Sequence, residues 1–403
     1  MDAPADAIDA ATDAPRNTAS VTVMVGGSGA AGWVAYFQSA DSTLNTTATT
    51  DATGTATGLV VGSGGFVSII GPPSMSPADT IVTWTSVEAG DHFVFARPQS
   101  TVQPVFDIPT YPGCTAYKVA TTCGTGFAEV GSGVLPAQVA FGGDLVDCVG
   151  PQDVTVIAFP SPYVPPIASF FVADQTIANG ATLDLSAQTY VPATPRTYTW
   201  INDADSGELI MSEQLVSARG TTFTADGMGA TGSPPTVSQD ALVAGAQQDV
   251  VQTMIGPAPT DHYMYEWGQG ESYVGDWGDN RLPDLFGSTY SAATKQVSWT
   301  ATGGTIAGNL VTIVLEALRT NELDWHWTVV SPTAPIQLPT LPTTIYDWNI
   351  AASDITAVNV TVLMNVPDLD VARQIIVGPL QLAGLETGSA GVISVAESSG
   401  GDL

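Results

Sequence analysis

The sequence predicts an all-β protein, built of tandem antiparallel β-sandwich domains. Short runs rich in β-branched and aromatic residues recur along the chain, among them 21–25 (VTVMV), 153–160 (DVTVIAFP) and 358–366 (VNVTVLMNV). The 41 Gly and 28 Pro residues separate these runs as turn formers do. Helical periodicity is nearly absent, and only residues 239–251 (QDALVAGAQQDVV) suggest a modest helix. A chain of 403 residues is long enough for two or three domains.

Residues 1–18 are almost all Asp, Ala, Pro and Thr, and we expect them to form a disordered linker. The segment has neither the basic n-region nor the apolar h-region of a signal peptide. It resembles the Asp-Ala-Pro spacer that follows the lipidated cysteine in many lipoproteins of myxobacteria and their relatives. The lipobox cysteine itself is absent from the sequence. The resemblance implies an exported protein, at the outer-membrane surface or outside the cell, with a lipid anchor at a missing upstream Cys.

Residues 19–98 form the clearest predicted domain, with seven strand-like runs at roughly 20–25, 32–38, 44–50, 55–61, 65–71, 80–86 and 91–96. Thr50, Asp51 and Gly54 supply a T-D-x-x-G motif before the next strand. Asp51 and Gly54 suit a tight turn, because Asp bonds its own backbone and Gly tolerates positive φ. On this motif the segment resembles the carboxypeptidase regulatory-like, transthyretin-like sandwich, an Ig-like all-β fold. The resemblance implies a stalk, spacer or adhesion module.

Further domains are expected beyond the boundary near residues 97–104. Residues 99–230 predict a second sandwich, and residues 231–403 predict a Trp-rich β domain, either separate from 99–230 or joined with it in one unit. Strands are expected near 115–121, 126–130, 137–142 and 153–159. No internal repeat of fixed period is visible, which disfavours a solenoid or a propeller.

Three cysteines, Cys114, Cys123 and Cys148, predict one disulfide and one leftover thiol, which implies an oxidising compartment. We favour Cys123 with Cys148 and keep Cys114 with Cys123 as the alternative. Metal ligation is disfavoured because the three histidines lie elsewhere and no CxxC occurs.

The net charge of −30 arises from 39 acidic residues against only 9 Lys and Arg. Nine dispersed bases cannot neutralise a phosphate backbone, which excludes nucleic acid as a partner, and anionic lipid surfaces are disfavoured for the same reason. No apolar run reaches the roughly 18 to 20 residues of a membrane span. Ca²⁺ is a weak hypothesis, because residues 202–208 and 276–280 offer oxygens without matching an EF-hand.

One glycine motif has the spacing of a dinucleotide-binding site. Gly27, Gly29 and Gly32 spell G-x-G-x-x-G after a strand, and Asp51 follows about twenty residues later. The dinucleotide fingerprint requires a helix after the third glycine. Turn and β-branched residues follow here instead, so we interpret the motif as a glycine-rich β-turn and predict no cofactor.

Catalytic motifs are not recognisable, and no catalytic residue is predicted. Neither G-x-S-x-G nor H-E-x-x-H occurs. His326, beside Asp324, and His262 are interpreted as exposed or hydrogen-bonded strand residues rather than general bases. A glycoside-hydrolase pair among the carboxylates of residues 266–279 is a weaker hypothesis.

An aromatic segment offers the one candidate ligand site. Its residues are Tyr263, Tyr265, Trp267, Tyr273 and Trp277, with Asp276 beside them. Flat aromatic faces and carboxylates together suit a sugar, but Tyr265 and Trp267 could equally alternate inward as core.

The leading functional prediction is therefore a non-enzymatic surface protein with a structural or adhesive role, whose partners are polysaccharide or other surface proteins. A carbohydrate-binding protein is the second hypothesis, and an unrecognised extracellular hydrolase is the third.

Overall fold

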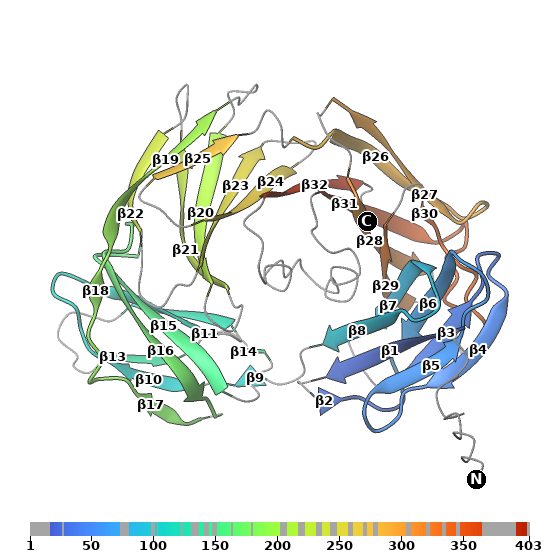
Figure 1. The fold of residues 1–403 in the computed structure, drawn as a ribbon, viewed down its shortest axis with the longest axis horizontal. Coiled ribbons are helices and arrows are strands. Elements are labelled where there is room, and N and C mark those ends of the chain that lie inside the picture. The colour runs from blue at the N-terminus through green and yellow to red at the C-terminus, as the bar shows by residue number, and fades with distance from the viewer. Residues whose placement is uncertain are drawn as a thin grey trace, which may run out of the picture.

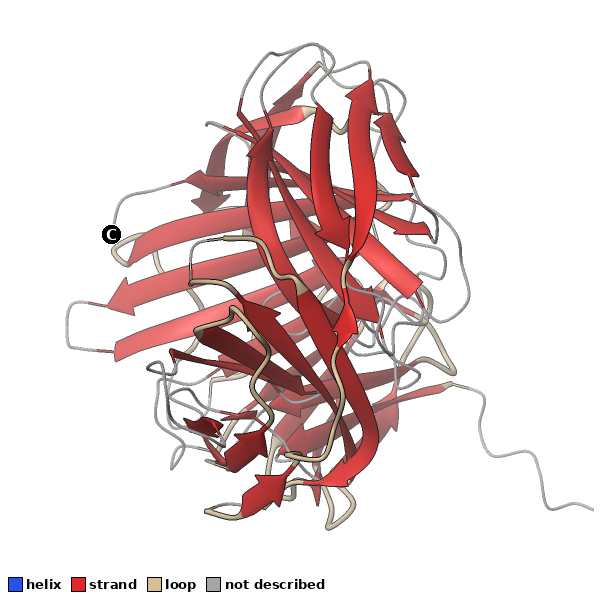
Figure 2. Ribbon diagram, turned by 90° about the vertical axis from the view of Figure 1, so that its left-hand side faces the viewer, coloured by secondary structure: helices blue, strands red, loops and turns tan. Residues whose placement is uncertain are grey.

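A computed structural model gives the fold, and it is all-β in every described part of the chain (Figure 2). No helix occurs among the described residues, which confirms the predicted all-β class. The structure describes residues 17–25, 28–72, 80–97, 101–102, 104–121, 124–129, 137–140, 145–146, 151–162, 164–178, 180–201, 208–216, 222–230, 236–241, 248–256, 261–268, 272–276, 281–303, 308–319, 323–332, 336–343, 347–364 and 392–400.

The first sandwich, which we call unit 1, has two sheets. Its strands are β1 (Thr18–Val25), β2 (Ser28–Gly29), β3 (Val34–Gln38), β4 (Leu44–Thr49), β5 (Thr55–Leu59), β6 (Gly65–Ile70), β7 (Thr80–Val87) and β8 (His92–Arg97). The smaller sheet has β1 between β5 and β8, and β8 runs parallel to β1. The larger sheet has the order β4-β3-β6-β7. All seven strands predicted from the sequence of this unit are present.

Unit 2 and unit 3 repeat this arrangement. Unit 2 comprises β10 (Val105–Ile108), β11 (Ala116–Thr121), β12 (Gly124–Glu129), β13 (Ala137–Ala140), β15 (Pro151–Phe159), β16 (Ala168–Thr176) and β17 (Thr182–Asp184). Unit 3 comprises β19 (Thr194–Ile201), β20 (Glu208–Val216), β21 (Thr222–Ala230), β22 (Thr236–Ala241), β23 (Gln248–Gly256), β24 (Asp261–Gly268) and β25 (Ser272–Asp276). The connecting segments hold three short strands, β9 (Thr101–Val102), β14 (Leu145–Val146) and β18 (Val191–Pro192).

In each of these units the first strand lies between the fourth and the seventh, and the seventh is parallel to it: β13-β10-β17 and β22-β19-β25. The other sheet places the third, second, fifth and sixth strands side by side: β12-β11-β15-β16, extended by β18, and β21-β20-β23-β24. The same strand order therefore occurs in units 1, 2 and 3.

Unit 4 departs from this order at one place. It comprises β26 (Asp284–Ser291), β27 (Gln296–Thr302), β28 (Leu310–Arg319), β29 (Leu323–Ser331), β30 (Ile336–Gln337), β31 (Ile355–Met364) and β32 (Val392–Gly400). Its larger sheet, β29-β28-β31-β32, keeps the common order if β27 counts as the first strand. In its smaller sheet, β30-β27-β26, the preceding strand β26 takes the place of the seventh strand and is antiparallel to β27.

The described residues thus contain four sandwich units where the sequence predicts two or three domains. The predicted boundary at residue 230 lies between β21 and β22, inside unit 3. The repeat is one of strand order, since the first strands begin at the unequally spaced residues Thr18, Val105, Thr194 and Gln296. Backbone pairing can repeat while side chains and loop lengths diverge, and this explains why no fixed period is visible in the sequence.

The larger sheets of units 3, 4 and 1 join edge to edge in one 12-stranded sheet of order β21-β20-β23-β24-β32-β31-β28-β29-β7-β6-β3-β4. β24 pairs antiparallel with β32, and β29 pairs parallel with β7. Unit 4 therefore returns to lie beside unit 1, as the orange and blue strands in Figure 1 show. The larger sheet of unit 2 is separate.

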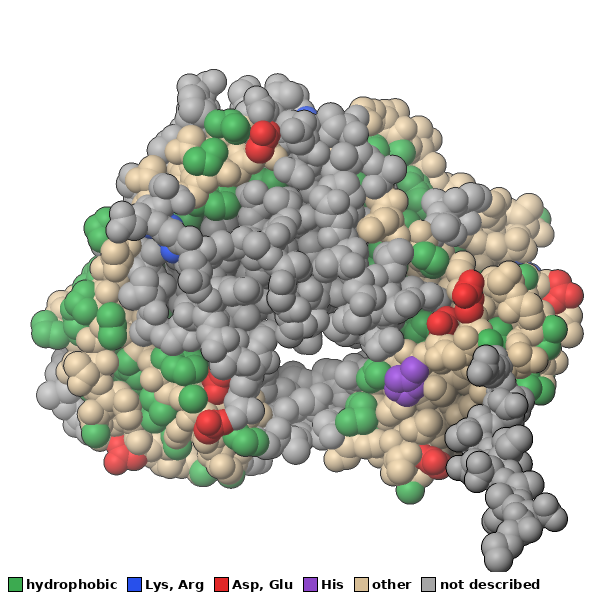
Figure 3. Space-filling view, viewed as in Figure 1, with side chains coloured by type: hydrophobic (Ala, Val, Ile, Leu, Met, Phe, Trp, Pro, Cys, Tyr) green, Lys and Arg blue, Asp and Glu red, His purple; other side chains and the backbone are tan. Residues whose placement is uncertain are grey.

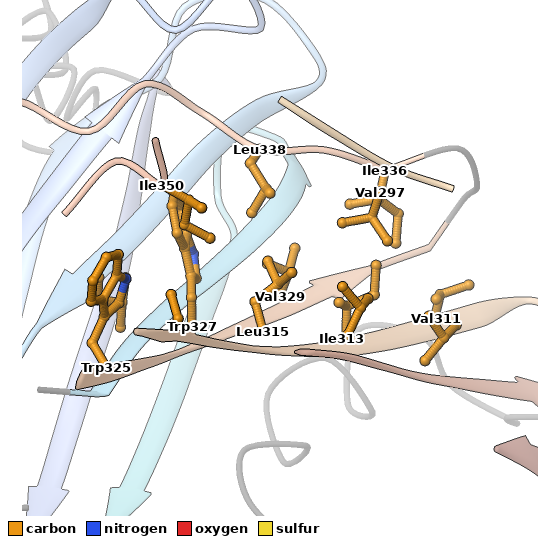
Figure 4. Close-up of a cluster of buried hydrophobic side chains, with 14 of the residues drawn as sticks. Val297, Val311, Ile313, Leu315, Trp325, Trp327, Val329, Ile336, Leu338 and Ile350 are labelled. Atoms are coloured by element: carbon orange, nitrogen blue, oxygen red, sulfur yellow. The ribbon is translucent and has the colours of Figure 1, made fainter. Parts of the chain in front are cut away.

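The two faces of this sheet support different cores. Val67, Val82 and Trp84 on one face pack into the core of unit 1, which also takes in Val330 of β29. Trp327, the residue on β29 that pairs with Ile81, belongs to the core of unit 4 on the opposite face. Figure 4 shows that core, with Trp325 and Trp327 on the same side of the strand toward Ile350 and Leu338. Because β6 has cores on both faces, all six of its residues are buried.

Two sequence interpretations of unit 1 are confirmed. Gly32 lies in a turn, and the strand β3 rather than a helix follows it, as the interpretation as a β-turn requires; Gly27 lies outside the described residues. The Asp51 turn forms as expected, because Asp51 Oδ1 accepts hydrogen bonds from the backbone N–H of Thr53 at 2.8 Å and of Thr55 at 3.0 Å. Gly54 has a φ of 80°.

One prediction of secondary structure is wrong. The segment 239–251 is not a helix where it is described, because residues 239–241 belong to β22 and residues 248–251 belong to β23. Its apolar residues suit either structure over so short a stretch, and the ladders to β19 and β20 decide the outcome.

Candidate functional site

The predicted aromatic site is divided between two sheets of unit 3. Tyr263, Tyr265 and Trp267 occupy alternate positions of β24, a strand paired on both sides within the 12-stranded sheet. Tyr273 and Asp276 belong to β25, the parallel neighbour of β19 in the smaller sheet. Trp277 lies outside the described residues. The structure therefore does not present this segment as one loop.

Tyr273 packs inside unit 3. Its ring centroid lies 6.0 Å from that of Tyr198 and 6.0 Å from that of Trp200, and the Trp200 contact is edge-on. Its hydroxyl oxygen is buried without a hydrogen-bond partner. A Cβ on the adjacent Gly275 would lie 2.7 Å from Trp200 Cδ1 and 2.8 Å from the Tyr273 hydroxyl. This geometry places the half-buried Tyr273 in an aromatic cluster with Tyr198 and Trp200.

The most organised polar group in this region joins unit 3 to unit 4. His262 on β24 is buried, and its Nε2 lies 2.7 Å from Oδ1 of Asp284, the first residue of β26. Arg281 also contacts this carboxylate oxygen, at 3.4 Å. Burial raises the pKa of Asp284, but the hydrogen bonds and charges of His262 and Arg281 lower it more, so the carboxyl pKa lies below its usual value. Asp284 is therefore ionised at neutral pH.

A histidine–aspartate pair can serve as a general base only if the imidazole reaches a substrate. His262 is 4% exposed, and its strand is paired on both sides. The geometry therefore fits an inter-unit polar joint, which agrees with the interpretation of His262 as a hydrogen-bonded strand residue.

His326 contributes no comparable site. It lies on β29 opposite Glu316, and the two side chains are 4.0 Å apart and both partly exposed. An exposed pair of this kind contributes little to stability.

Arg319, at the end of β28, organises the segment that covers the core of unit 4. It donates to both carboxylate oxygens of Asp354, at 3.0 and 2.7 Å. It also donates to the backbone oxygens of Asp347 and Asn349, at 2.7 and 2.8 Å. Its guanidinium carbon lies 5.0 Å from the ring centroid of Trp325. Four of the five N–H donors of the guanidinium thus hold the chain, which gives Arg319 a structural role.

The cysteine prediction is partly tested. Cys114 is a free thiol, so the alternative pairing with Cys123 does not form. The favoured pairing of Cys123 with Cys148 lies outside the described residues. Burial raises the pKa of Cys114 to about 11, which makes this thiol a weak nucleophile.

No group of three or more His, Cys, Asp or Glu side chains that could hold a metal ion occurs among the described residues. Most of the oxygen-rich segment 202–208 and the residues 277–280 lie outside them. Within the described ranges, no helix has the length and apolar character to cross a membrane.

Comparison with known proteins gives no family assignment. No family model matches the sequence, and no curated protein matches it. Among solved structures, the chain is similar to the Bacillus anthracis TIE protein, with 12% identity over 64% of this chain and a TM-score of 0.16. This chain spans 49% of that protein's length. A likeness this low carries no argument about fold or function.

Sequence reasoning missed Asp284, Arg319 and Asp354. Each acts through a partner distant in the sequence, and a single Asp or Arg in a strand-rich sequence gives no sign of that partner. The sequence did offer one indication of such pairs, because it contains only nine Arg and Lys in 403 residues. A charged side chain near a core normally has a specific counter-ion, so each of these few cations was a candidate for a buried ion pair.

Proposed function

We propose that this chain is a non-enzymatic, exported surface protein with a structural or adhesive role. The observation that carries the proposal is the fusion of three sandwich units through their sheet edges, by antiparallel pairing of β24 with β32 and parallel pairing of β29 with β7. Sheet edges that pair within the chain turn flexible tandem domains into one stiff body. A stiff body suits a spacer or a scaffold.

The two-sheet form of unit 1, with seven longer strands and the two-residue β2, supports its resemblance to the carboxypeptidase regulatory-like, transthyretin-like sandwich. The Asp51–Gly54 turn that carries the resemblance is well ordered by its own hydrogen bonds. A stalk or adhesion module is the role that this resemblance implies.

The surface supports the same role. On the face drawn in Figure 3, the described atoms show scattered hydrophobic and acidic side chains and almost no Lys or Arg. Such a surface favours neither nucleic acid nor anionic lipid, and it suits a protein that remains soluble outside the cell.

Protease shaving of intact native cells tests export, and the intact mass of the native protein tests anchoring. We expect the chain to be cleaved from unbroken cells, and its native N-terminus to carry a diacylated cysteine upstream of residue 2. Protection in intact cells together with an unmodified Met1 as the native start would overturn the proposal.

A glycan array and an activity screen separate the competing roles. Binding that Trp267→Ala or Trp277→Ala abolishes would favour the carbohydrate-binding hypothesis over a purely structural role. Turnover of peptide, ester or glycoside substrates would contradict the non-enzymatic assignment.

A further inference from the structure

Three exposed aliphatic side chains gather at one corner of unit 1. Leu44, Leu59 and Val61 are 43%, 45% and 61% exposed. They are three of the eight large hydrophobic side chains that are exposed among the described residues, and Val61 is the most exposed of the eight. We call these three residues the apolar corner. A single exposed Leu or Val is ordinary, but a group of them indicates an interaction surface.

Two contacts show that the three residues belong to the same end of the unit. Leu59 N donates a hydrogen bond to Thr46 Oγ1 at 3.0 Å, which places the end of β5 beside the start of β4. A Cβ on Gly64 would lie 3.9 Å from the Cβ of Ala40. The loop that follows β5 therefore lies beside the loop that precedes β4, and the apolar corner is formed where they meet.

The chain enters unit 1 at this corner. Val60 N donates to the backbone oxygen of Asn17 at 2.8 Å. Thr18, the first residue of β1, is the cross-strand partner of Leu59. Any segment that precedes Asn17 is therefore attached beside the apolar corner. The 16 residues before Asn17 reach at most about 55 Å when fully extended, so an anchor upstream of them keeps this corner near the surface that holds the anchor.

The charges of the chain decide which lipid surface suits the corner. Asp41 is the single charged residue in the ranges 39–45 and 59–65, which form the corner and its two loops. Aliphatic side chains gain by leaving water at a bilayer interface. Anionic lipid would repel both Asp41 and the net charge of −30. The corner therefore fits a zwitterionic lipid surface.

We propose that the apolar corner contacts a zwitterionic lipid surface, against which an anchor upstream of Asn17 holds it. The proposal rests on the exported, lipid-anchored role proposed above. The anchor supplies the main attachment, and the corner adds a weaker second contact because tethering raises its effective concentration at the surface. In Figure 1, β4 and β5 lie on the side of the molecule opposite to unit 3. This contact therefore turns unit 3 away from the membrane.

A tethered vesicle assay tests the contact. A hexahistidine tag before residue 1 of the full chain replaces the anchor and binds phosphatidylcholine vesicles that carry a small share of nickel-chelating lipid. We expect Val61→Asp to weaken vesicle binding about tenfold, because it removes an apolar contact and adds a charge. Val274→Asp is the matched control: Val274 is 58% exposed but lies on β25 in unit 3, so binding should be unchanged.

Hydrogen exchange locates the contact without any substitution. The amides of residues 61–64 should exchange more slowly on the tethered vesicles than in the free protein at the same concentration. Unchanged exchange there, or equal vesicle binding by wild type and Val61→Asp, would overturn the proposal. So would tighter binding to phosphatidylglycerol vesicles. Protection of 61–64 that grows with protein concentration in the absence of vesicles would show that a second copy covers the corner instead.

The artificial tether separates this proposal from the proposed function. A failed vesicle assay overturns the lipid contact alone, and export and anchoring are still decided by protease shaving and by the intact mass of the native protein. A native N-terminus without a lipid would overturn both.

Discussion

Buried polar side chains lie at the contacts between units, where they fix how the sheets are aligned. Trp327 Nε1 donates to Thr83 Oγ1 at 2.9 Å across the β7–β29 ladder. Gln38 Nε2 donates to the backbone oxygen of Thr340 at 2.7 Å, which links unit 1 to the segment covering unit 4. A polar group buried at a joint is satisfied in one register only, so these contacts favour a single alignment over slipped ones.

Arg319→Ala tests the largest of these polar networks. The Asp354 side chain is only 1% exposed, so loss of its cation leaves a buried carboxylate without its counter-ion. We expect the free energy of unfolding to fall by about 2–4 kcal/mol, measured by urea denaturation. Arg319→Lys should recover part of this loss, because it keeps the charge but not the four donated hydrogen bonds. Full recovery of stability in Arg319→Lys would contradict the role of the fork.

The same network predicts a pH dependence. Burial raises the pKa of Asp354, but hydrogen bonds from Arg319 and from the Ala351 N–H lower it more, so its pKa lies below the ordinary value of 3.8. A depressed carboxyl pKa contributes stability that is complete above the unfolded pKa and is lost as pH falls through the folded pKa. Wild type should therefore lose more stability than Arg319→Ala between about pH 5 and pH 2. If the unfolding free energies of wild type and Arg319→Ala fall in parallel over this pH range, the lowered pKa of Asp354 is contradicted.

Substitutions of Tyr273 test whether its ring belongs to a core or to a sugar site. Tyr273→Phe should leave stability unchanged or slightly raise it, because the buried hydroxyl has no hydrogen-bond partner. Tyr273→Ala should cost about 3–5 kcal/mol by opening a cavity beside Trp200 and Tyr198. Thermal denaturation of the two variants measures both effects. Full stability of Tyr273→Ala would show that the ring is not part of the core.

Cys114 should react slowly with alkylating agents in the folded protein. With a pKa of about 11, only about one thiol in a thousand is ionised at pH 8, and the thiolate is the reactive form. Mass spectrometry after iodoacetamide should show labelling of Cys114 mainly after denaturation. Rapid labelling of the native protein would contradict the burial of this thiol.

At the scale of single elements, two glycine turns offer a matched pair. Gly54 and Gly62 have φ values of 80° and 77°, so alanine is strained at both. A Cβ at Gly54 would lie 2.2 Å from the Val23 carbonyl oxygen, whereas a Cβ at Gly62 meets nothing within 4 Å. Gly62→Ala should therefore cost about 1 kcal/mol and Gly54→Ala about 2–4 kcal/mol in urea denaturation. Equal losses of unfolding free energy in the two variants would show that the Asp51 turn accommodates a Cβ at Gly54 without strain.

Strands whose neighbours lie close in the sequence were predictable. β1 has alternating burial, with Val21, Val23 and Val25 inward, and that pattern is visible in VTVMV. The turn between β4 and β5 was predictable from Asp51 and Gly54, whose effects are local. The helix prediction for residues 239–251 was wrong, because a short apolar stretch has no periodicity strong enough to distinguish a strand from a helix.

Contacts between distant strands were not predictable. The β7–β29 ladder joins Thr80 to His326, and nothing in either strand's own sequence specifies the other. The neighbours of the candidate aromatic residues were not predictable for the same reason: Tyr273 is a neighbour of Tyr198 only because β25 pairs with β19. Which face of a strand is covered, and by what, depends on such long-range pairing rather than on local composition.

At the scale of the whole molecule, the shared sheet predicts that the chain unfolds as two cooperative parts. Units 1, 3 and 4 share the 12-stranded sheet, and Val330 and Leu310 of unit 4 pack into the core of unit 1. Unit 2 has its own sheets and its own core around Phe106, Val156 and Phe170. Shared sheets couple the unfolding of the units that form them, whereas a separate core can melt alone.

Differential scanning calorimetry should accordingly resolve two transitions, one for unit 2 and one for the fused body. Val156→Ala and Val67→Ala are matched probes, since both side chains are fully buried, one in each part. Each should remove about 2 kcal/mol, and each should move only its own transition. The shift should be larger for unit 2, about 8–16 °C against about 4 °C or less, because a smaller part has a smaller unfolding entropy. A single transition that both variants shift equally would mean that unit 2 is coupled to the sheet as tightly as the other three.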